Sequence, residues 1–124
     1  MTKQMPSAVR PVSSADRRWA RGLLRRRWGT EVIVSRGRTH DAGELPGFIA
    51  ESLGKRKGLV TYRISNRSCE IVTLDSLAQG RGLGSALIRA TIRAAQRAGC
   101  SRVWLITTND NVRALRFTGD AASA

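Results

Sequence analysis

The stretch SLAQGRGLGSALIRATIRAAQRAG, residues 76–99, places three glycines within five positions directly in front of a run of helix-forming residues. A helix start needs only a capping side chain such as Ser or Asp. Gly80, Gly82 and Gly84 each lose more conformational entropy on folding than another residue would, and local structure does not explain that loss. Beyond them, apolar residues recur at helical spacing and Gly99 follows the last turn. The pattern predicts an amphipathic helix whose N-terminal backbone is approached closely by some other group.

The segments around this helix predict a mixed α+β domain. Residues 69–77 (CEIVTLDSL) and 101–108 (SRVWLITT) are short and rich in β-branched residues, so we expect a strand before the glycines and another after the helix. Upstream, the same reasoning predicts strands over 9–12, 30–35, 48–52 and 58–65 and a helix over 13–29, capped by Ser13 or Ser14. Residues 109–117 (NDNVRALRF) predict a short helix that begins at Asn109, Asp110 or Asn111.

Arginine supplies most of the formal net charge of +13, which arises from 22 basic and 9 acidic residues. Five arginines share one side of the helix expected over 13–29: Arg17, Arg18, Arg21, Arg25 and Arg26. A basic helix face is either simply solvated or faces an anionic partner, which here means a nucleic acid or a phosphorylated cofactor. Composition favours the solvated face and leaves the other two open.

Length and composition indicate one domain over residues 1–124. No apolar run approaches the roughly 20 residues that cross a bilayer, and the N-terminus lacks the apolar centre of a signal peptide, so we expect a soluble, cytoplasmic protein without membrane contact. Cys69 and Cys100 lack CxxC spacing and are expected to be buried thiols, with no metal site. His40, alone in the polar connector 36–47, is expected at the surface.

Three phosphate-binding patterns compete for the glycine-rich turn. A P-loop needs GxxxxGK[ST], but the segment holds no lysine, so that pattern fails. A dinucleotide fingerprint GxGxxG meets Ser85 where its third glycine or alanine belongs. The pattern QxxGxG fits fully, with Gln79, Gly82 and Gly84 between a strand and a helix.

With this motif in this setting, the sequence resembles the GCN5-related N-acetyltransferase (GNAT) superfamily over roughly residues 45–117. The resemblance implies the GNAT fold, a central, mostly antiparallel sheet with helices on both faces, and acetyl-CoA as the acetyl donor. It assigns Val72, Thr73 and Leu74 to main-chain pairing with the pantetheine arm. It assigns a further set of residues to the cofactor, mainly to its pyrophosphate: Gln79, Gly80, Arg81, Gly82, Leu83, Gly84, Ser85 and, from beyond the next strand, Asn111. The physics agrees, because unpaired N–H groups and the dipole at a helix N-terminus attract anions.

The reaction implied is acetyl transfer to a primary amine, which requires a base because an amine is protonated at neutral pH. Glu70 is the leading candidate, since strand alternation puts it on the same face as Val72 and Leu74, where a carboxylate is out of place. Asp75 and Glu51 are weaker candidates. An acidic residue at a strand end that is merely solvated is the competing interpretation of Glu70.

The sequence also departs from the family pattern. Thr118 stands where the family often has a tyrosine that protonates the leaving thiolate, and after residue 117 little remains for the two strands that normally follow. The resemblance therefore predicts a member shortened after about residue 117 and lacking those last two strands. Its strand over 101–108 would have an open outer edge, and that edge would favour a homodimer.

Four functions are compatible with these observations. The favoured one is an N-acetyltransferase that transfers acetyl from acetyl-CoA to an amine on a small molecule or peptide. A catalytically impaired remnant or CoA-binding module follows closely. A small basic nucleic-acid-binding protein is less favoured, because six scattered aromatic residues make no stacking platform. A fragment of a dinucleotide-binding oxidoreductase comes last.

Overall fold

The computed structural model describes residues 7–35, 38–78, 82–106 and 112–116. Its sheet has six strands in the order β1-β4-β5-β6-β7-β8: β1 (Ser7–Pro11), β4 (Gly47–Ser52), β5 (Lys55–Ser65), β6 (Ser68–Ser76), β7 (Arg102–Ile106) and β8 (Val112–Arg116). All neighbours are antiparallel except β6 and β7, which are parallel. A separate antiparallel hairpin is formed by β2 (Val32–Ser35) and β3 (Arg38–Asp41).

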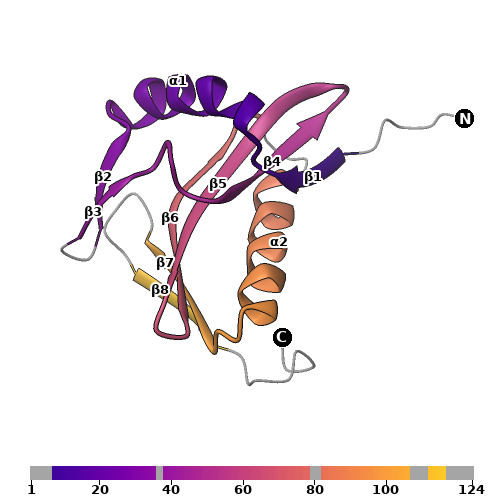
Figure 1. Ribbon diagram of the computed structural model, residues 1–124. Helices are drawn as coiled ribbons and strands as arrows, with labels where there is room; N and C mark the ends of the chain where they lie inside the picture. Colours follow the sequence, from indigo (N-terminus) through magenta and orange to yellow (C-terminus); the bar gives the residue numbers. More distant parts are fainter. Residues whose placement is uncertain (1–6, 36–37, 79–81, 107–111, 117–124) are drawn as a thin grey trace, which may run out of the picture.

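Two helices cover the two faces of this sheet (Figure 1). Helix α2 (Leu83–Arg97) packs on one face against Phe48 and Val60, while α1 (Arg17–Trp28) and the β2–β3 hairpin pack on the other against Ile49 and Leu59. Adjacent residues of one strand thus face opposite helices, as alternation along a strand requires. The mixed α+β fold with helices on both faces, expected from the sequence, is confirmed.

Helix α1 ends where the sequence indicates, but it begins at Arg17, and the predicted cap Ser13 lies before the turn that leads into it. A short 3₁₀ turn, η1 (Ser14–Asp16), precedes it, and the Asp16 carboxylate accepts hydrogen bonds from the backbone N–H and the hydroxyl of Ser13. Gly29, with φ of +79°, ends the helix in the left-handed conformation that glycine adopts without strain. Helix α2 likewise ends just before Gly99, whose φ is +86°.

Asp16 is also a buried ionic junction between η1, β1 and β5. It is 1% exposed and accepts hydrogen bonds from Arg10 at 2.7 and 3.0 Å and from Arg56 at 2.9 Å. These guanidinium groups, Arg10 foremost, hold the pKa of the Asp16 carboxyl far below its usual range. Arg10 also pairs with Glu51, at 2.9 Å.

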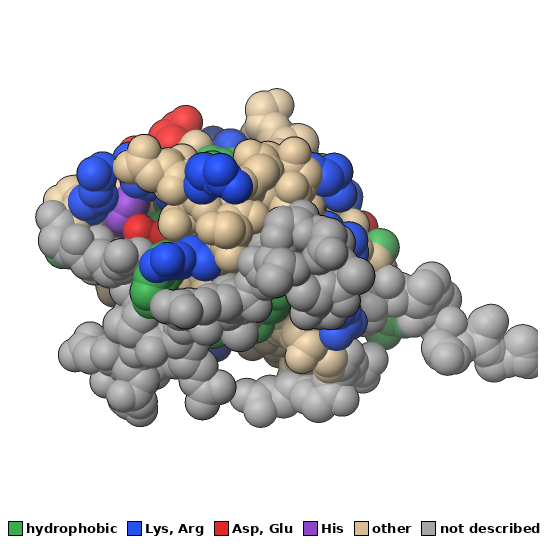
Figure 2. Space-filling view, turned by 90° about the horizontal axis from the view of Figure 1, so that it is seen from below, with side chains coloured by type: hydrophobic (Ala, Val, Ile, Leu, Met, Phe, Trp, Pro, Cys, Tyr) green, Lys and Arg blue, Asp and Glu red, His purple; other side chains and the backbone are tan. Residues whose placement is uncertain are grey.

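Several arginines on the basic face of α1 bind the end of β3 and the segments that flank the β2–β3 hairpin. Arg17 donates to the carbonyl oxygens of Gly43 and Leu45, and Arg21 pairs with Glu31 and two other acidic side chains. Figure 2 shows the molecule from the side away from α1, and there the Lys and Arg side chains lie apart from one another, without forming one stripe. Neither helix among the described residues is long and apolar enough to cross a membrane.

The end of the chain differs from the sequence-based prediction. Residues 112–116, expected within a short helix, form strand β8, which pairs antiparallel with β7 from Arg102↔Arg116 to Ile106↔Val112. The helix prediction was therefore wrong over 112–116, and so was the expectation that β7 has an open outer edge; the rest of 109–117 lies outside the described residues. An unpaired edge leaves a row of N–H and C=O groups without partners, and the local hairpin supplies those partners. The argument for a homodimer formed through the edge of β7 therefore no longer holds.

The polar connector over 36–47 also contains more structure than expected. It forms β3, which pairs with β2 so that His40 lies opposite Ile33. His40 is 4% exposed, so the expectation of a surface histidine was wrong. Alternation in this hairpin turns Ile33 and His40 toward the sheet and leaves Val32 and Val34 exposed.

Candidate functional site

Strands β6 and β7 separate partway along their length. Their parallel pairing runs from Ser68↔Arg102 to Ile71↔Leu105 and stops there, whereas β6 continues to Ser76 and stays paired with β5. Along Val72–Ser76 no described strand occupies the β7 side, so among the described residues the backbone N–H and C=O groups on that side have no strand partner, and an extended ligand could supply one. Five residues at about 3.3 Å each give an edge of about 16 Å, enough for an extended molecule to lie along it.

A β-bulge marks the point of separation. Thr61 pairs with Thr73 and the next residue, Tyr62, pairs with Ile71, so Val72 has no partner on β5. A bulge bends its strand and increases its twist, which turns the end of β6 away from β7. It also shifts the alternation of side chains: Ile71 and Leu74, three residues apart, both pack on the α2 side, and Val72 packs on the α1 side.

This bulge corrects one argument about Glu70. Its carboxylate shares a face with Val72, as alternation predicts, but not with Leu74, which lies on the opposite face. Alternation holds only while each residue has one partner, and the extra residue at Val72 reverses it.

The N-terminus of α2 lies at the end of the chain segment that follows β6 (Figure 1). Its N-cap, Gly82, adopts φ of +70° and makes no side-chain capping bond, and the first turn contains no acidic residue. The first described intrahelical bond of this turn runs from the Ala86 N–H to the Gly82 carbonyl. A Cβ added at Gly82 or Gly84 would meet nothing within 4 Å among the described atoms. A helix N-terminus without a side-chain cap, with room beside its glycines, suits an anionic group.

Glu70 directly precedes Ile71, the last residue of β6 that pairs with β7. It is 8% exposed and pairs in register with Arg63 on β5 and Trp104 on β7. His40 lies over it from β3, with Nε2 at 3.9 Å from the Glu70 Oε1. This Nε2 is buried and has no hydrogen-bond partner within the described part of the protein. A buried carboxylate beside a histidine is an arrangement that can accept and pass on a proton.

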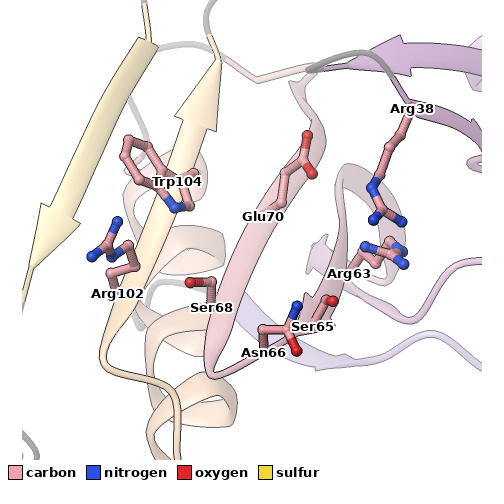
Figure 3. Close-up of a pocket in the computed structure, with 8 residues that line it drawn as sticks. All are labelled: Arg38, Arg63, Ser65, Asn66, Ser68, Glu70, Arg102 and Trp104. Carbon is pink, nitrogen blue, oxygen red and sulfur yellow. The ribbon is translucent and has the colours of Figure 1, made fainter.

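A pocket of about 250 Å³ opens beside Glu70, on the sheet face opposite α2 (Figure 3). Residues of β3, β5, β6, β7 and the turn between β5 and β6 line it: Arg38, Arg63, Ser65, Asn66, Ser68, Glu70, Arg102 and Trp104. The register explains why they converge, because two rows cross the three sheet strands on this face. One row is Arg63, Glu70 and Trp104, and the other is Ser65, Ser68 and Arg102.

The other predicted site residues divide into four groups. Val72, Thr73 and Leu74 lie on the free edge of β6, and Gly82, Leu83, Gly84 and Ser85 form the first turn of α2. Gln79, Gly80, Arg81 and Asn111 lie outside the described residues. The alternative bases have structural partners: Asp75 accepts a 2.9 Å hydrogen bond from the Trp28 indole, and Glu51 pairs with Arg10.

Sequence reasoning missed His40 and the arginines of the pocket. Arg63 and Arg102 alternate with apolar residues in their strands, which marks them as belonging to the face away from α2. The strand register that places them on either side of Glu70 cannot be read from that alternation. The two cysteines are buried as expected, and burial raises the pKa of the Cys69 thiol to about 12. Among the described residues no three His, Cys, Asp or Glu side chains are grouped to hold a metal ion.

Comparison with known proteins places the chain in a family. The model of the acetyltransferase (GNAT) family matches residues 14–119, so the chain belongs to that family. It is 44% identical over 92 residues to the uncharacterized protein YdhI of Bacillus subtilis (strain 168), a match that covers 73% of this chain and 57% of YdhI. It is 30% identical over 108 residues to the uncharacterized protein YxbD of the same organism, covering 86% of this chain and 68% of YxbD. This chain thus spans little more than half the length of YdhI.

Solved structures agree on the fold. A GNAT family acetyltransferase from Brucella melitensis, crystallised in complex with acetyl-CoA, superposes with a TM-score of 0.63 at 17% sequence identity, covering 94% of this chain and 95% of that one. At this identity the likeness establishes the fold.

Proposed function

We propose that this protein binds acetyl-CoA between β6 and β7 and transfers the acetyl group to a primary amine. The observation that carries the proposal is the free edge of β6 over Val72–Ser76, which leads toward an uncapped helix N-terminus with open space at Gly82 and Gly84. An extended amide-containing arm suits the first feature and a pyrophosphate suits the second. The GNAT neighbour from Brucella melitensis, whose complex holds acetyl-CoA, supports the same ligand.

In the proposed reaction the free amine attacks the thioester carbonyl carbon. A C–N bond forms, the C–S bond breaks, and the thiolate of CoA leaves with the electron pair of that bond. The Glu70 carboxylate takes the proton that the amine nitrogen must lose, and His40, at 3.9 Å from Glu70, can pass it on. A thiol with a pKa near 8.5 is a good leaving group, so departure of the thiolate demands less of an acid than departure of an alkoxide does. Thr118 lies outside the described residues.

Calorimetric titration with acetyl-CoA, followed by an assay of thiol release with a panel of amines, tests the proposal. Glu70→Gln should reduce kcat by about 10²- to 10⁴-fold, the usual contribution of a general base, and leave the affinity for CoA unchanged. Glu44→Gln is the matched control, because it neutralises an exposed carboxylate whose ion pair is with Arg21 of α1 and not with a residue of the pocket. Absence of CoA binding would refute the proposal, whereas binding without turnover on any amine would identify a CoA-binding module.

A further inference from the structure

The pocket beside Glu70 is rich in positive charge. Three guanidinium groups, of Arg38, Arg63 and Arg102, line it together with one carboxylate, Glu70. Ser65 and Ser68 add neutral hydroxyl groups. A cavity with this lining favours a ligand that carries negative charge.

These three arginines differ from those that serve the fold. Arg10, Arg21, Arg25, Arg27 and Arg56 each form an ion pair with a carboxylate. Arg38, Arg63 and Arg102 form none with the described acidic residues, although Glu70 lies in the same pocket. Like charges that share a cavity repel one another, and an anion bound between them relieves the repulsion.

The pocket has two chemically distinct ends (Figure 3). Figure 3 shows Arg38 and Arg63 reaching into the same part of it, from β3 and β5, while Arg102 and Trp104 stand on the other side of Glu70. The Arg102 guanidinium carbon lies 5.2 Å from the centre of the Trp104 ring, a cation–π contact that holds it in place. Because Arg63 and Glu70 are register partners, their Cβ atoms lie about 5 Å apart. A small molecule can therefore reach both the carboxylate and a guanidinium.

From this arrangement we infer the class of acceptor: a small primary amine that carries an anionic group, carboxylate or phosphate, a few bonds away from the nitrogen. The inference rests on the proposed function, since it treats the pocket as the acceptor side of that reaction. The amine lies at Glu70, near the point where β6 and β7 part, and the anionic group lies at Arg63 and Arg38. The volume of about 250 Å³ falls just below the roughly 300–1,000 Å³ typical of drug-sized ligands, which favours a small acceptor over a large one.

Acceptor pairs that differ in one charge test this inference. The thiol-release assay compares amino acids with their amides, for the carboxylate, and O-phosphoethanolamine with ethanolamine, for the phosphate. We expect the anionic member of at least one pair to have kcat/KM at least about ten-fold higher, equivalent to about 1.4 kcal/mol. The pair with the larger ratio identifies the anionic group. Equal or reversed ratios in both pairs would overturn the inference.

Single substitutions test which residue of the pocket causes the preference for anionic amines. Arg63→Gln should bring the ratio below about three-fold, mainly through KM, and retain CoA binding. Arg18→Gln, which removes one exposed charge from α1, should leave the ratio unchanged. A ratio that survives Arg63→Gln would place anion recognition elsewhere and overturn the assignment of this pocket.

Binding measurements separate this inference from the proposed function. Calorimetric titration of the same pairs into the full chain, with and without saturating CoA, requires no turnover. If CoA does not bind but the anionic amines bind more tightly than their neutral partners, the proposed function fails and the charge preference stands. If CoA binds and both members of each pair bind equally, only the acceptor class fails.

Discussion

Replacing Gly84 by alanine should stabilise the fold and weaken the binding of coenzyme A at the same time. Gly84 lies in the first turn of α2 without a positive φ, and an added Cβ would meet no described atom within 4 Å. In the free protein the methyl group therefore fits without strain. With CoA bound, the same methyl group would occupy space that a phosphate oxygen needs in order to reach the helix N–H groups.

The expected gain in stability and the expected loss of CoA affinity can both be given as magnitudes. Alanine in place of glycine in a helix stabilises by about 0.5 to 1 kcal/mol. Loss of one hydrogen bond to a charged group costs about 1.5 to 3 kcal/mol, which corresponds to roughly a 10- to 100-fold rise in Kd. Gly84 suits the test better than Gly82, whose φ of +70° would strain any side chain and confuse stability with binding.

Urea unfolding and calorimetric titration with CoA measure the two effects on the same sample. Gly22→Ala is the matched control, because Gly22 lies inside α1, where an added Cβ would be 3.4 Å from the flexible end of Arg26. It should raise stability to a similar extent and leave the Kd for CoA unchanged. If Gly84→Ala is stabilised but binds CoA as tightly as the wild type does, the phosphates are not held by this helix turn and the reasoning is refuted.

Three further outcomes follow from the described contacts. Asp16→Asn should destabilise the fold by about 3 kcal/mol at pH 7, near the lower end for breaking a buried ion pair because Arg10 can reach water. The pKa of Asp16 is lowered in the folded state, so the ion pair contributes its full stability above about pH 4, the ordinary pKa of the carboxyl, and this stability is lost as the pH falls below that value. The free energy of unfolding of the variant should therefore fall less steeply with acid than that of the wild type. Gly47→Ala should lower the free energy of unfolding by about 3 kcal/mol or more, because its Cβ would lie 2.0 Å from the carbonyl oxygen of Val60. Thermal unfolding measures this, and a change below about 1 kcal/mol would contradict the close approach of β4 and β5. Cys69, whose thiol pKa is raised to about 12, should react with iodoacetamide at pH 8 far more slowly in the native protein than in urea, as mass spectrometry can show, and rapid native labelling would show that the thiol is accessible.

The helices and most strands could be predicted because their signals are local. The apolar period of α2, its glycine-rich start and the glycine after its last turn all lie within one stretch of chain. Strand β6 was recognisable in the same way, and the resemblance to the GNAT superfamily assigned ligand pairing to Val72, Thr73 and Leu74, which the structure places beyond the last β6 residue paired with β7. The bulge at Val72 was not recognisable, because it depends on how Thr61 and Tyr62 pair across the hairpin.

Prediction failed where a distant or neighbouring strand decided the outcome. Residues 112–116 have no strong strand pattern, and they form a strand because their backbone pairs with the edge of β7. His40 has the polar neighbours of a turn residue, yet its hairpin folds over the sheet and brings it to Glu70. Neither fact is encoded in the residues immediately around the one concerned.

The sequence by itself thus determined most strands, both helices and the glycine-rich start of α2, because periodicity, capping and the absence of a Cβ act within a few residues of chain, and the resemblance to the GNAT superfamily implied how these elements are layered. Only the tertiary structure decided which charged side chains share a pocket. Arg63, Glu70 and Trp104 come from three strands, and hydrogen-bond register across the sheet fixes their alignment. A shift of one residue in that register would turn any one of them to the opposite face, so the chemistry of the pocket exists only once the sheet is assembled.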